Sequence, residues 1–251
     1  MRHVLWILLP AVLLLAAATP SRAEPMVLPP GSTVAGRTIG EYTADWWRWA
    51  LSFTAPNDPF TDPTGALANL NQSGPVFFVA GTTGGAAERT FTVPAGTHLL
   101  VPLLVGELSQ LEIGFDQTPV QVRQAAREQA DQIDSLLAFL NGVAVPDLFS
   151  HREVSPDFTF VAAPGNPIDV PAGFSGVAVA DGYWLMLTPL EPGERLDLRF
   201  GGAASAFGFS VDVTAHITGV AVPEPSGLAL AGVGAFGLLG YVWQRRKRAS
   251  A

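Results

Sequence analysis

The chain has 251 residues, with 22 acidic side chains against 14 basic ones, and it contains no cysteine. The lack of cysteine excludes disulfide bonds and thiol chemistry, so the burial of apolar surface must stabilise the fold. Residues 24–222 carry 21 acidic side chains and 8 arginines but no lysine, which gives a net charge near −13. Such a surface repels phosphate backbones and argues against nucleic-acid binding.

The first 23 residues have the three-part pattern of a secretory signal peptide. A short basic region at Arg2 and His3 precedes an almost unbroken apolar run from Val4 to Ala18, and residues 21–23 fit a cleavage site. The apolar run is short for a membrane span and the cleavage site follows it directly, so removal is favoured over a retained anchor. We therefore predict an exported protein whose mature chain begins at Glu24.

A tryptophan-rich stretch, TIGEYTADWWRWALSF, comes next. Its apolar side chains recur at helical spacing, which predicts a short amphipathic helix from about Ile39 to Phe53. Its tryptophans, and one in a later strand, either pack in the core or form a platform that stacks on sugar rings. Core packing is favoured, because aromatic stripes at helical spacing usually face inward. The candidates for sugar stacking are Trp46, Trp47, Trp49 and Trp184.

Residues 54–74 are polar and interrupted by prolines, and we predict a loop. Asp58 and Asp62, with Asn57 and Thr64, offer the hard oxygen ligands that Ca²⁺ prefers. Their spacing does not match an EF-hand, however, and Asp, Asn and Pro are the residues of ordinary turns. The plain turn is the favoured interpretation and Ca²⁺ at Asp58 and Asp62 is the alternative; no other cofactor is expected.

Three extended runs are predicted next, at residues 75–81, 89–94 and 97–105. The glycine-rich segment GTTGGAAE between the first two lacks the ending of a phosphate-binding loop, so we interpret it as a hairpin connection. Glu107 and Glu112 follow the third run, at a position suited to the edge of a cleft. Paired carboxylates can hydrolyse a glycosidic bond, although with 21 acidic residues some pair looks suggestive by chance.

A long helix is predicted from Thr118 to about Leu140. Thr118, Pro119 and Gln121 fit a capping box with proline in the first turn, and Gly142 supplies a left-handed stop. One face of the helix is apolar apart from a single glutamine. That face consists of Val122, Ala126, Gln129, Ile133, Leu136, Leu137 and Leu140.

The final third of the body is predicted to be β-rich. ADGYWLMLTPL is a long apolar run that ends in a proline–glycine turn, and RLDLRF and FGFSVDVTAHI alternate between apolar and polar residues. The inward residues of the last strand are Phe207, Phe209, Val211, Val213, Ala215 and Ile217. The predicted fold is a mainly β, antiparallel β-sandwich, with a jelly roll as one form, that carries the tryptophan-rich helix near its N-terminus and the long helix inserted midway.

The C-terminal segment, residues 222–251, combines three features in a fixed order. Pro223, Glu224 and Pro225 hold the chain extended, and residues 227–243 form an uncharged run at the short end of a transmembrane helix. A basic cluster then supplies the positive-inside anchor. The cluster consists of Arg245, Arg246, Lys247 and Arg248. We predict that residues 24–221 lie outside the membrane and that the last residues lie in the cytoplasm.

This order of tripeptide, short glycine-rich span and terminal arginines resembles the PEP-CTERM sorting signal over residues 222–248. Proteins with that signal belong to Gram-negative bacteria that produce exopolysaccharide. The resemblance implies that an exosortase in the inner membrane recognises and removes the tail. The protein is then expected to be held briefly at the inner membrane, with its bulk in the periplasm, before it reaches the cell surface or the extracellular matrix.

The body also resembles a family of uncharacterised secreted bacterial proteins. The resemblance covers DWWRWALS, then Asn57, Pro59, Asp62, Thr64 and Gly65, and the stretches QSGPVFFVAGT, RTFTVPAG and DGYWLMLTPLEPG. Cysteines often stand in that family at the positions of Ala68 and Phe91, so the resemblance implies that packing replaces a disulfide here. It implies no activity.

No catalytic constellation is recognised in the sequence. His98, His151 and His216 lie far apart and in no paired metal-ligand spacing, and the sequence has no Gly-x-Ser-x-Gly elbow. The leading hypothesis is a non-catalytic envelope or matrix protein with an exosortase, the inner membrane and exopolysaccharide as partners. The alternative is a carbohydrate-binding or glycan-processing surface protein.

Overall fold

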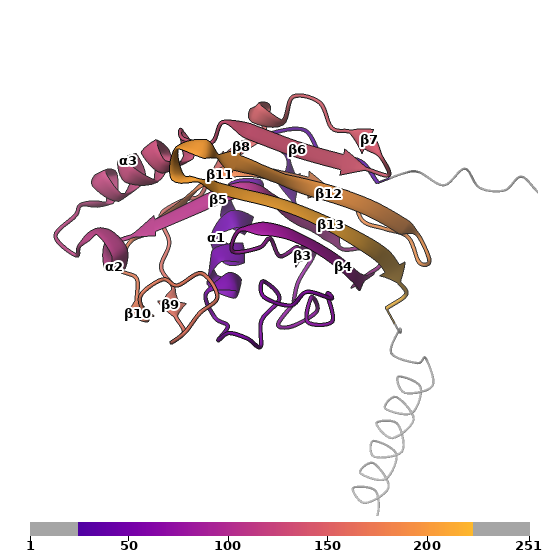
Figure 1. Cartoon of the computed structure of the whole chain (residues 1–251), viewed down its shortest axis with the longest axis horizontal. Coiled ribbons are helices and arrows are strands. Elements are labelled where there is room, and N and C mark those ends of the chain that lie inside the picture. The colour runs from indigo at the N-terminus through magenta and orange to yellow at the C-terminus, as the bar shows by residue number, and fades with distance from the viewer. Residues whose placement is uncertain (1–24, 223–251) are drawn as a thin grey trace, which may run out of the picture.

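The computed structural model describes residues 25–222 and confirms a mainly β body, in which two sheets face each other across a shared core (Figure 1). The four-stranded sheet consists, in order, of β3 (Val76–Phe78), β5 (His98–Ser109), β11 (Ala178–Leu187) and β8 (Arg152–Val154). The five-stranded sheet consists, in order, of β4 (Gly85–Pro94), β13 (Phe209–Val220), β12 (Arg195–Ala204), β6 (Ser135–Leu140) and β7 (Val143–Ala144).

Both sheets are mixed, and this corrects the predicted antiparallel sandwich. β3 pairs with β5 in parallel and β4 pairs with β13 in parallel, whereas the other pairs in the two sheets are antiparallel. The hairpin predicted at GTTGGAAE is also wrong, because β3 and β4 belong to different sheets. The second half of that segment is already strand, since β4 begins at Gly85.

The four-stranded sheet is buried on both faces. In β5, Leu99 and Val101 point into the core between the sheets, whereas Leu100 points to the opposite face and packs with helix α1 (Ile39–Ala50). All ten residues of β11 are buried. A strand covered on both faces reads as a continuous apolar run, which explains why ADGYWLML does not alternate.

Helix α1 confirms the predicted tryptophan-rich helix. The Thr38 hydroxyl accepts a hydrogen bond from the backbone N–H of Glu41, and the Glu41 carboxylate accepts one from the N–H of Thr38, so a capping box starts the helix. Nine of its 12 residues are buried, and they pack against the face of the four-stranded sheet that points away from the other sheet.

The long helix predicted from Thr118 is correct at its start and wrong at its end. Helix α3 (Pro119–Ala130) has the predicted cap at Thr118, but the chain then turns and continues as β6. The segment SLLAFL forms six residue pairs with β12, which would otherwise be left with an unpaired edge. Gly142, with a φ of 80°, therefore closes the β6–β7 hairpin together with Asn141 and does not end a helix.

The strand pattern predicted for the final third is confirmed in its central part. Leu196, Leu198 and Phe200 of β12 are buried, and the buried residues of β13 are Val211, Val213, Ala215 and Ile217. Phe207 and Phe209, predicted to point inward, are 63 % and 38 % exposed. They sit where the β12–β13 connection leaves the core.

Short elements complete the described chain. They are β1 (Thr33–Val34), β2 (Arg37–Thr38), α2 (Gln110–Ile113), η1 (Leu148–Ser150), β9 (Val161–Ala162), β10 (Gly173–Phe174) and η2 (Ser205–Phe207). Ala68 and Phe91, where the resembling family often has cysteine, are both buried in the core between the sheets.

No helix within residues 25–222 is long and apolar enough to cross a membrane. The predicted signal peptide (1–23), the sorting tripeptide (223–225), the predicted span (227–243) and the basic cluster (245–248) lie outside the described residues.

Candidate functional site

The four tryptophans considered as candidates for sugar stacking lie inside the body. Trp46, Trp47, Trp49 and Trp184 are each at most 6 % exposed. The ring centroid of Trp46 lies 5.1 Å from that of Trp47 and 5.3 Å from that of Trp184, both in edge-on geometry. Because these rings are buried against one another, they do not form the open platform that sugar stacking requires. The burial agrees with core packing, the favoured interpretation, and not with the stacking alternative.

The two aspartates considered as Ca²⁺ ligands are bound by the loop itself. Asp58 accepts two hydrogen bonds through Oδ1 and one through Oδ2, from donors two and three residues further on. Asp62 accepts two through Oδ1 and one through Oδ2, from donors two and five residues further on. Among residues 25–222 there is no group of three side chains that could hold a metal ion. The contacts are those of ordinary turns.

A buried arginine, which the sequence analysis did not single out, closes this loop. Arg89 of β4 is 4 % exposed, and burial lowers the pKa of its guanidinium against the opposing charges of Asp62 and Asp58. Its N–H groups donate at 2.7–2.9 Å to the carbonyl oxygens of Phe60, Asp62, Ala80 and Gly81. The aspartate loop is thus a structural unit that is fixed to the sheet.

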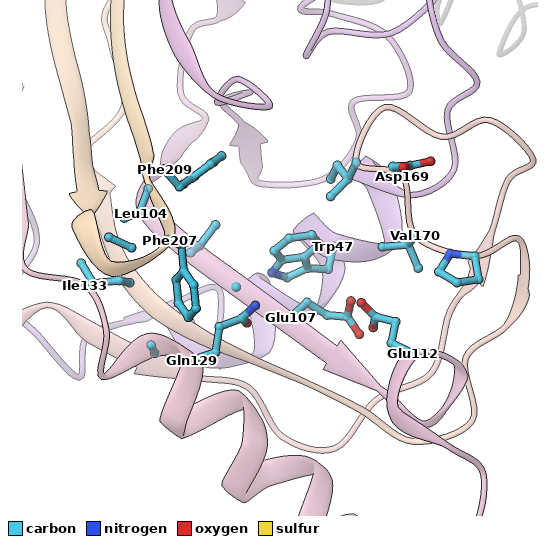
Figure 2. A pocket seen from close by; sticks show the side chains of 16 residues that line it. Trp47, Leu104, Glu107, Glu112, Gln129, Ile133, Asp169, Val170, Phe207 and Phe209 are labelled. Carbon is cyan, nitrogen blue, oxygen red and sulfur yellow. The ribbon is translucent and has the colours of Figure 1, made fainter.

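A cavity of about 460 Å³ lies at the free edge of β5 (Figure 2). β3 pairs with β5 only over residues 98–100, so further along β5 has β11 on one side and no strand of the described chain on the other. Helices α1, α2 and α3, the segment 168–171 and the β12–β13 connection surround this edge. The lining of the cavity includes the side chains of Trp47, Glu107, Glu112, Gln129, Asp169, Phe207 and Phe209.

A bulge in β5 turns Glu107 toward this cavity. The register between β5 and β11 shifts at Tyr183 and Trp184, which leaves Leu103 without a partner on β11. The extra residue reverses the alternation of side chains along the rest of β5. Glu107 therefore lies on the side of α1, near Trp47, and not in the core between the sheets.

Glu107 is a buried carboxyl group without a donor. It is 5 % exposed, and neither of its oxygens receives a hydrogen bond from an N–H or hydroxyl group of the described residues. Burial, and then the charge of Glu112, raise the pKa of Glu107 from its usual 4.5 to about 10. At neutral pH Glu107 is therefore a carboxylic acid that faces the carboxyl group of Glu112 (Figure 2).

One oxygen of Glu112 is already hydrogen-bonded to Ser109. Its Oε2 accepts hydrogen bonds from the N–H and the hydroxyl of Ser109, at 2.9 and 2.7 Å, in the capping box that starts α2. Burial raises the pKa of Glu112, while these bonds and the hydrogen bond with Glu107 oppose the shift. One proton is thus held between two carboxyl groups, with Glu107 as donor and Glu112 as acceptor.

The rest of the cavity lining includes the indole N–H of Trp47 and apolar side chains. Trp47 is 5 % exposed, and its Nε1–H has no acceptor among the described residues. Phe207, Phe209 and Ile133 form an apolar wall. The side chain of Gln129 lies against Gly106 of β5. A Cβ atom at position 106 would come within 2.3 Å of the Gln129 Oε1, so any other residue there would displace the Gln129 side chain.

The sequence analysis singled out part of this site. Glu107 and Glu112 were considered because they follow an apolar run, and the structure brings them together. Asp169 was not considered, and Phe207 and Phe209 were considered only as inward strand residues, because the segments that carry these three residues approach β5 only in the folded chain. Gln129 gave a signal that was not used, since it was the one polar residue on the apolar face predicted for residues 122–140.

The three histidines of the body belong to no common site. His216 lies on the outer face of the five-stranded sheet, where its Nδ1 is 2.7 Å from Asp197 and its Nε2 3.2 Å from Glu88. These carboxylates raise the pKa of His216, whereas burial lowers the pKa of His98 and His151. His216 is thus part of a solvated strand face.

Comparison with known proteins supports the assignment of the tail. Residues 221–247 match the family described as PEP-CTERM protein-sorting motif. The motif implies an exported, membrane-sorted protein that an exosortase processes. The match begins directly after β13, which ends at Val220. No curated protein and no solved structure matches the chain.

Proposed function

We propose that this chain is a non-catalytic envelope protein that an exosortase cuts near Pro223–Pro225. The mature body is then released to the cell surface or to the extracellular matrix, where it associates with exopolysaccharide. The observation that carries the proposal is the sorting motif at residues 221–247, directly after the last strand. The acidic charge of the body keeps it soluble after release.

The contacts at both ends of the body support this path. Near the N-terminus, Leu28 N–H donates to the carbonyl oxygen of Met186 at 2.7 Å, and Thr188 N–H donates to that of Met26 at 2.9 Å. At the other end, the carbonyl oxygen of Val220 accepts a hydrogen bond from the N–H of Ala95 at 2.8 Å. Cleavage before Glu24 and after residue 222 therefore removes no strand pair from the body.

The test is the mass of the mature protein in a host that has the cognate exosortase. We expect the wild-type chain to lose its tail near residues 223–225, and Glu224→Ala to accumulate as an uncut, membrane-held form. Glu191→Ala is the matched control, because it changes an exposed glutamate in a turn of the body. Normal processing of Glu224→Ala, or full-length protein as the only wild-type species, would contradict the proposal.

A second candidate function, carbohydrate binding, is favoured by the cavity at the edge of β5. Its volume falls within the range of about 300–1,000 Å³ that is usual for small-molecule sites, and it contains buried polar groups that have no N–H, hydroxyl or acceptor partner among the described residues. Hydrolysis is less well supported. The carboxyl groups of glycosidases stand about 5 Å or more apart, whereas Glu107 and Glu112 are close enough to share a proton.

Glycan-array binding by the full chain in a non-ionic detergent tests this second candidate, and release of reducing ends from the bound glycans tests hydrolysis. We expect binding without hydrolysis. Cleavage of a bound glycan that Glu107→Gln abolishes would instead identify an enzyme.

A further inference from the structure

The cavity at the edge of β5 contains polar groups whose hydrogen-bonding capacity the described residues leave partly unused. Among residues 25–222, neither oxygen of Glu107 has an N–H or hydroxyl donor, and the Nε1–H of Trp47 has no acceptor. Both side chains are 95 % buried or more, since each is 5 % exposed. Buried polar groups are usually paired, and an unpaired one needs a specific explanation. A ligand that supplies both donors and an acceptor is such an explanation.

The charges around the cavity define the sign of that ligand. The lining contains three acidic side chains, Glu107, Glu112 and Asp169, and none of the lining residues is basic. An anion would be repelled by these groups and by the net charge of the body, near −13 for residues 24–222. A ligand with a positive charge is attracted by both.

We propose that this cavity binds the ammonium group of an amino sugar. The ammonium N–H groups donate to Glu107 and to the free oxygen of Glu112, and the Nε1–H of Trp47 donates to a neighbouring hydroxyl oxygen of the sugar. The inference rests on carbohydrate binding, the second of the functions proposed above, and it adds the chemical group that is recognised. It does not depend on processing of the tail.

An ammonium group fits the carboxyl pair better than a neutral hydroxyl does. The pair already holds one positive charge, the proton that Glu107 keeps because burial, and then the charge of Glu112, raise its pKa. An ammonium group brings its own charge and three donors, so it can replace that proton. On binding, the O–H bond of Glu107 breaks and the proton passes to the solvent. Both carboxyl groups are then ionised and face the ammonium group.

The apolar part of the cavity fits the body of a sugar. Phe207, Phe209 and Ile133 line the side that faces the β12–β13 connection, and Phe207 and Phe209 remain partly exposed. Aromatic rings of this kind can cover the C–H faces of a pyranose. A second cavity of about 180 Å³, which also borders Trp47, Ile168 and Phe209, continues along the edge of β5. The arrangement leaves room for more than one sugar unit.

The test uses the full chain in a non-ionic detergent and three disaccharides with the same β1,4-linked backbone. They carry an ammonium group (chitosan disaccharide), an acetamide (diacetylchitobiose) or a hydroxyl (cellobiose) at carbon 2. Isothermal titration calorimetry at pH 6, where an aliphatic amine carries its proton, measures each affinity. We expect the ammonium sugar to bind at least tenfold more tightly than the other two.

The variants and the proton count separate ligand binding from a structural role. Glu107→Gln should weaken the ammonium sugar at least tenfold, whereas Glu128→Gln, an exposed glutamate of α3, should leave its affinity unchanged. Titrations in buffers of different ionisation enthalpy should show that about one proton is released on binding to the wild type and none on binding to Glu107→Gln.

Four results would overturn the inference. They are equal binding of cellobiose or diacetylchitobiose, no binding of any of the three sugars, unchanged affinity in Glu107→Gln, and Ca²⁺ binding at Glu107 without binding of the ammonium sugar. The first leaves carbohydrate binding standing and removes only the ammonium. The second, together with an empty glycan array, removes the second candidate function as well, and neither bears on processing of the tail.

Discussion

The molecule contains two pairs of carboxyl groups, Asp58 with Asp62 and Glu107 with Glu112, that have different hydrogen-bond surroundings. Each of the four carboxylate oxygens of Asp58 and Asp62 accepts at least one hydrogen bond from the loop that carries them. Within the described part of the chain, Glu107 receives none from an N–H or hydroxyl group, and Glu112 accepts hydrogen bonds from Ser109 through one oxygen, Oε2. The first pair completes a turn, whereas the second is left open at a cavity.

The difference follows from the backbone that carries each pair. In a turn, N–H groups two to five residues further on point back at an aspartate and stabilise its charge. In a strand the N–H groups lie in the plane of the sheet, while side chains project above and below it. A strand glutamate such as Glu107 therefore has no local donor, and its charge is stabilised only by groups from elsewhere.

The largest effect is expected for Glu107→Gln when the free energy of unfolding is measured as a function of pH. Burial raises the pKa of Glu107 to about 10, so the folded chain keeps a proton that the unfolded chain loses above about pH 4.5. The free energy of unfolding therefore falls as pH rises through this window, by up to about 1.4 kcal/mol per unit. The variant lacks this loss, and we expect it to be about 4 kcal/mol more stable than the wild type at pH 8 and equal to it near pH 4.5.

Urea unfolding between pH 4.5 and 9 measures this difference, with Glu128→Gln as the control that should follow the wild type. Parallel curves for Glu107→Gln and the wild type would mean that Glu107 is ionised in the folded protein. The contrast between the two acidic pairs would then fail.

Asp58→Ala tests the other acidic pair. It should lower the free energy of unfolding, whereas Glu107→Gln should raise it. The substitution removes the acceptor of three hydrogen bonds in a fully buried position, and we expect a loss of about 3 kcal/mol at neutral pH. Asp157→Ala, which removes an exposed carboxylate from Arg123, should cost less than about 1 kcal/mol. Thermal unfolding with Ca²⁺ and with a chelator completes the test. A higher melting temperature with Ca²⁺ would show that the loop is a metal site and not a plain turn.

Two neighbouring tryptophans of α1, Trp46 and Trp47, show a similar contrast between a paired and an unpaired hydrogen-bond donor. The Nε1–H of Trp46 donates to the carbonyl oxygen of Val79 at 2.9 Å, whereas that of Trp47 has no acceptor in the described chain. Replacement by Phe removes similar packing in both cases, but only Trp46→Phe leaves a buried carbonyl group unpaired. We expect Trp46→Phe to be more destabilising than Trp47→Phe by about 1–2 kcal/mol in urea unfolding. Equal losses would indicate that Trp47 has a partner in solution.

The sequence predicted those parts of the fold that depend on local signals. The cap at Thr118, the alternation of RLDLRF and the helical spacing of Trp46, Trp47 and Trp49 are set within a few residues, and the structure confirms them. The end of α3 was missed because SLLAFL is compatible with both helix and strand, and its pairing with β12 decides between them. Asn141-Gly142 was the available clue, since this dipeptide is a strong hairpin signal.

The cavity was harder to predict for a physical reason. Glu107 lies on the α1 side only because of the bulge at Leu103, and a one-residue shift moves a strand side chain to the other face of the sheet. Alternation counted along β5 without the bulge places Glu107 in the core between the sheets. The parallel pairing of β4 with β13 is non-local as well, since it joins segments more than 100 residues apart.

The smallest expected effect concerns an acidic pair that solvent surrounds. Asp197 and Glu88 contact His216 on the outer face of the five-stranded sheet and raise the pKa of its imidazole, with Asp197 as the larger cause. A raised pKa means that this contribution to stability is present below about pH 6.5 and is lost as pH rises through the folded value. Asp197→Asn should lower the pKa of His216, seen by NMR titration of its ring protons, and change stability by less than about 0.5 kcal/mol, because the pair is screened. An unchanged pKa of His216 would show that Asp197 and His216 are not in contact in solution. A large loss of stability would mean that this exposed pair contributes as much to folding as the buried pairs do.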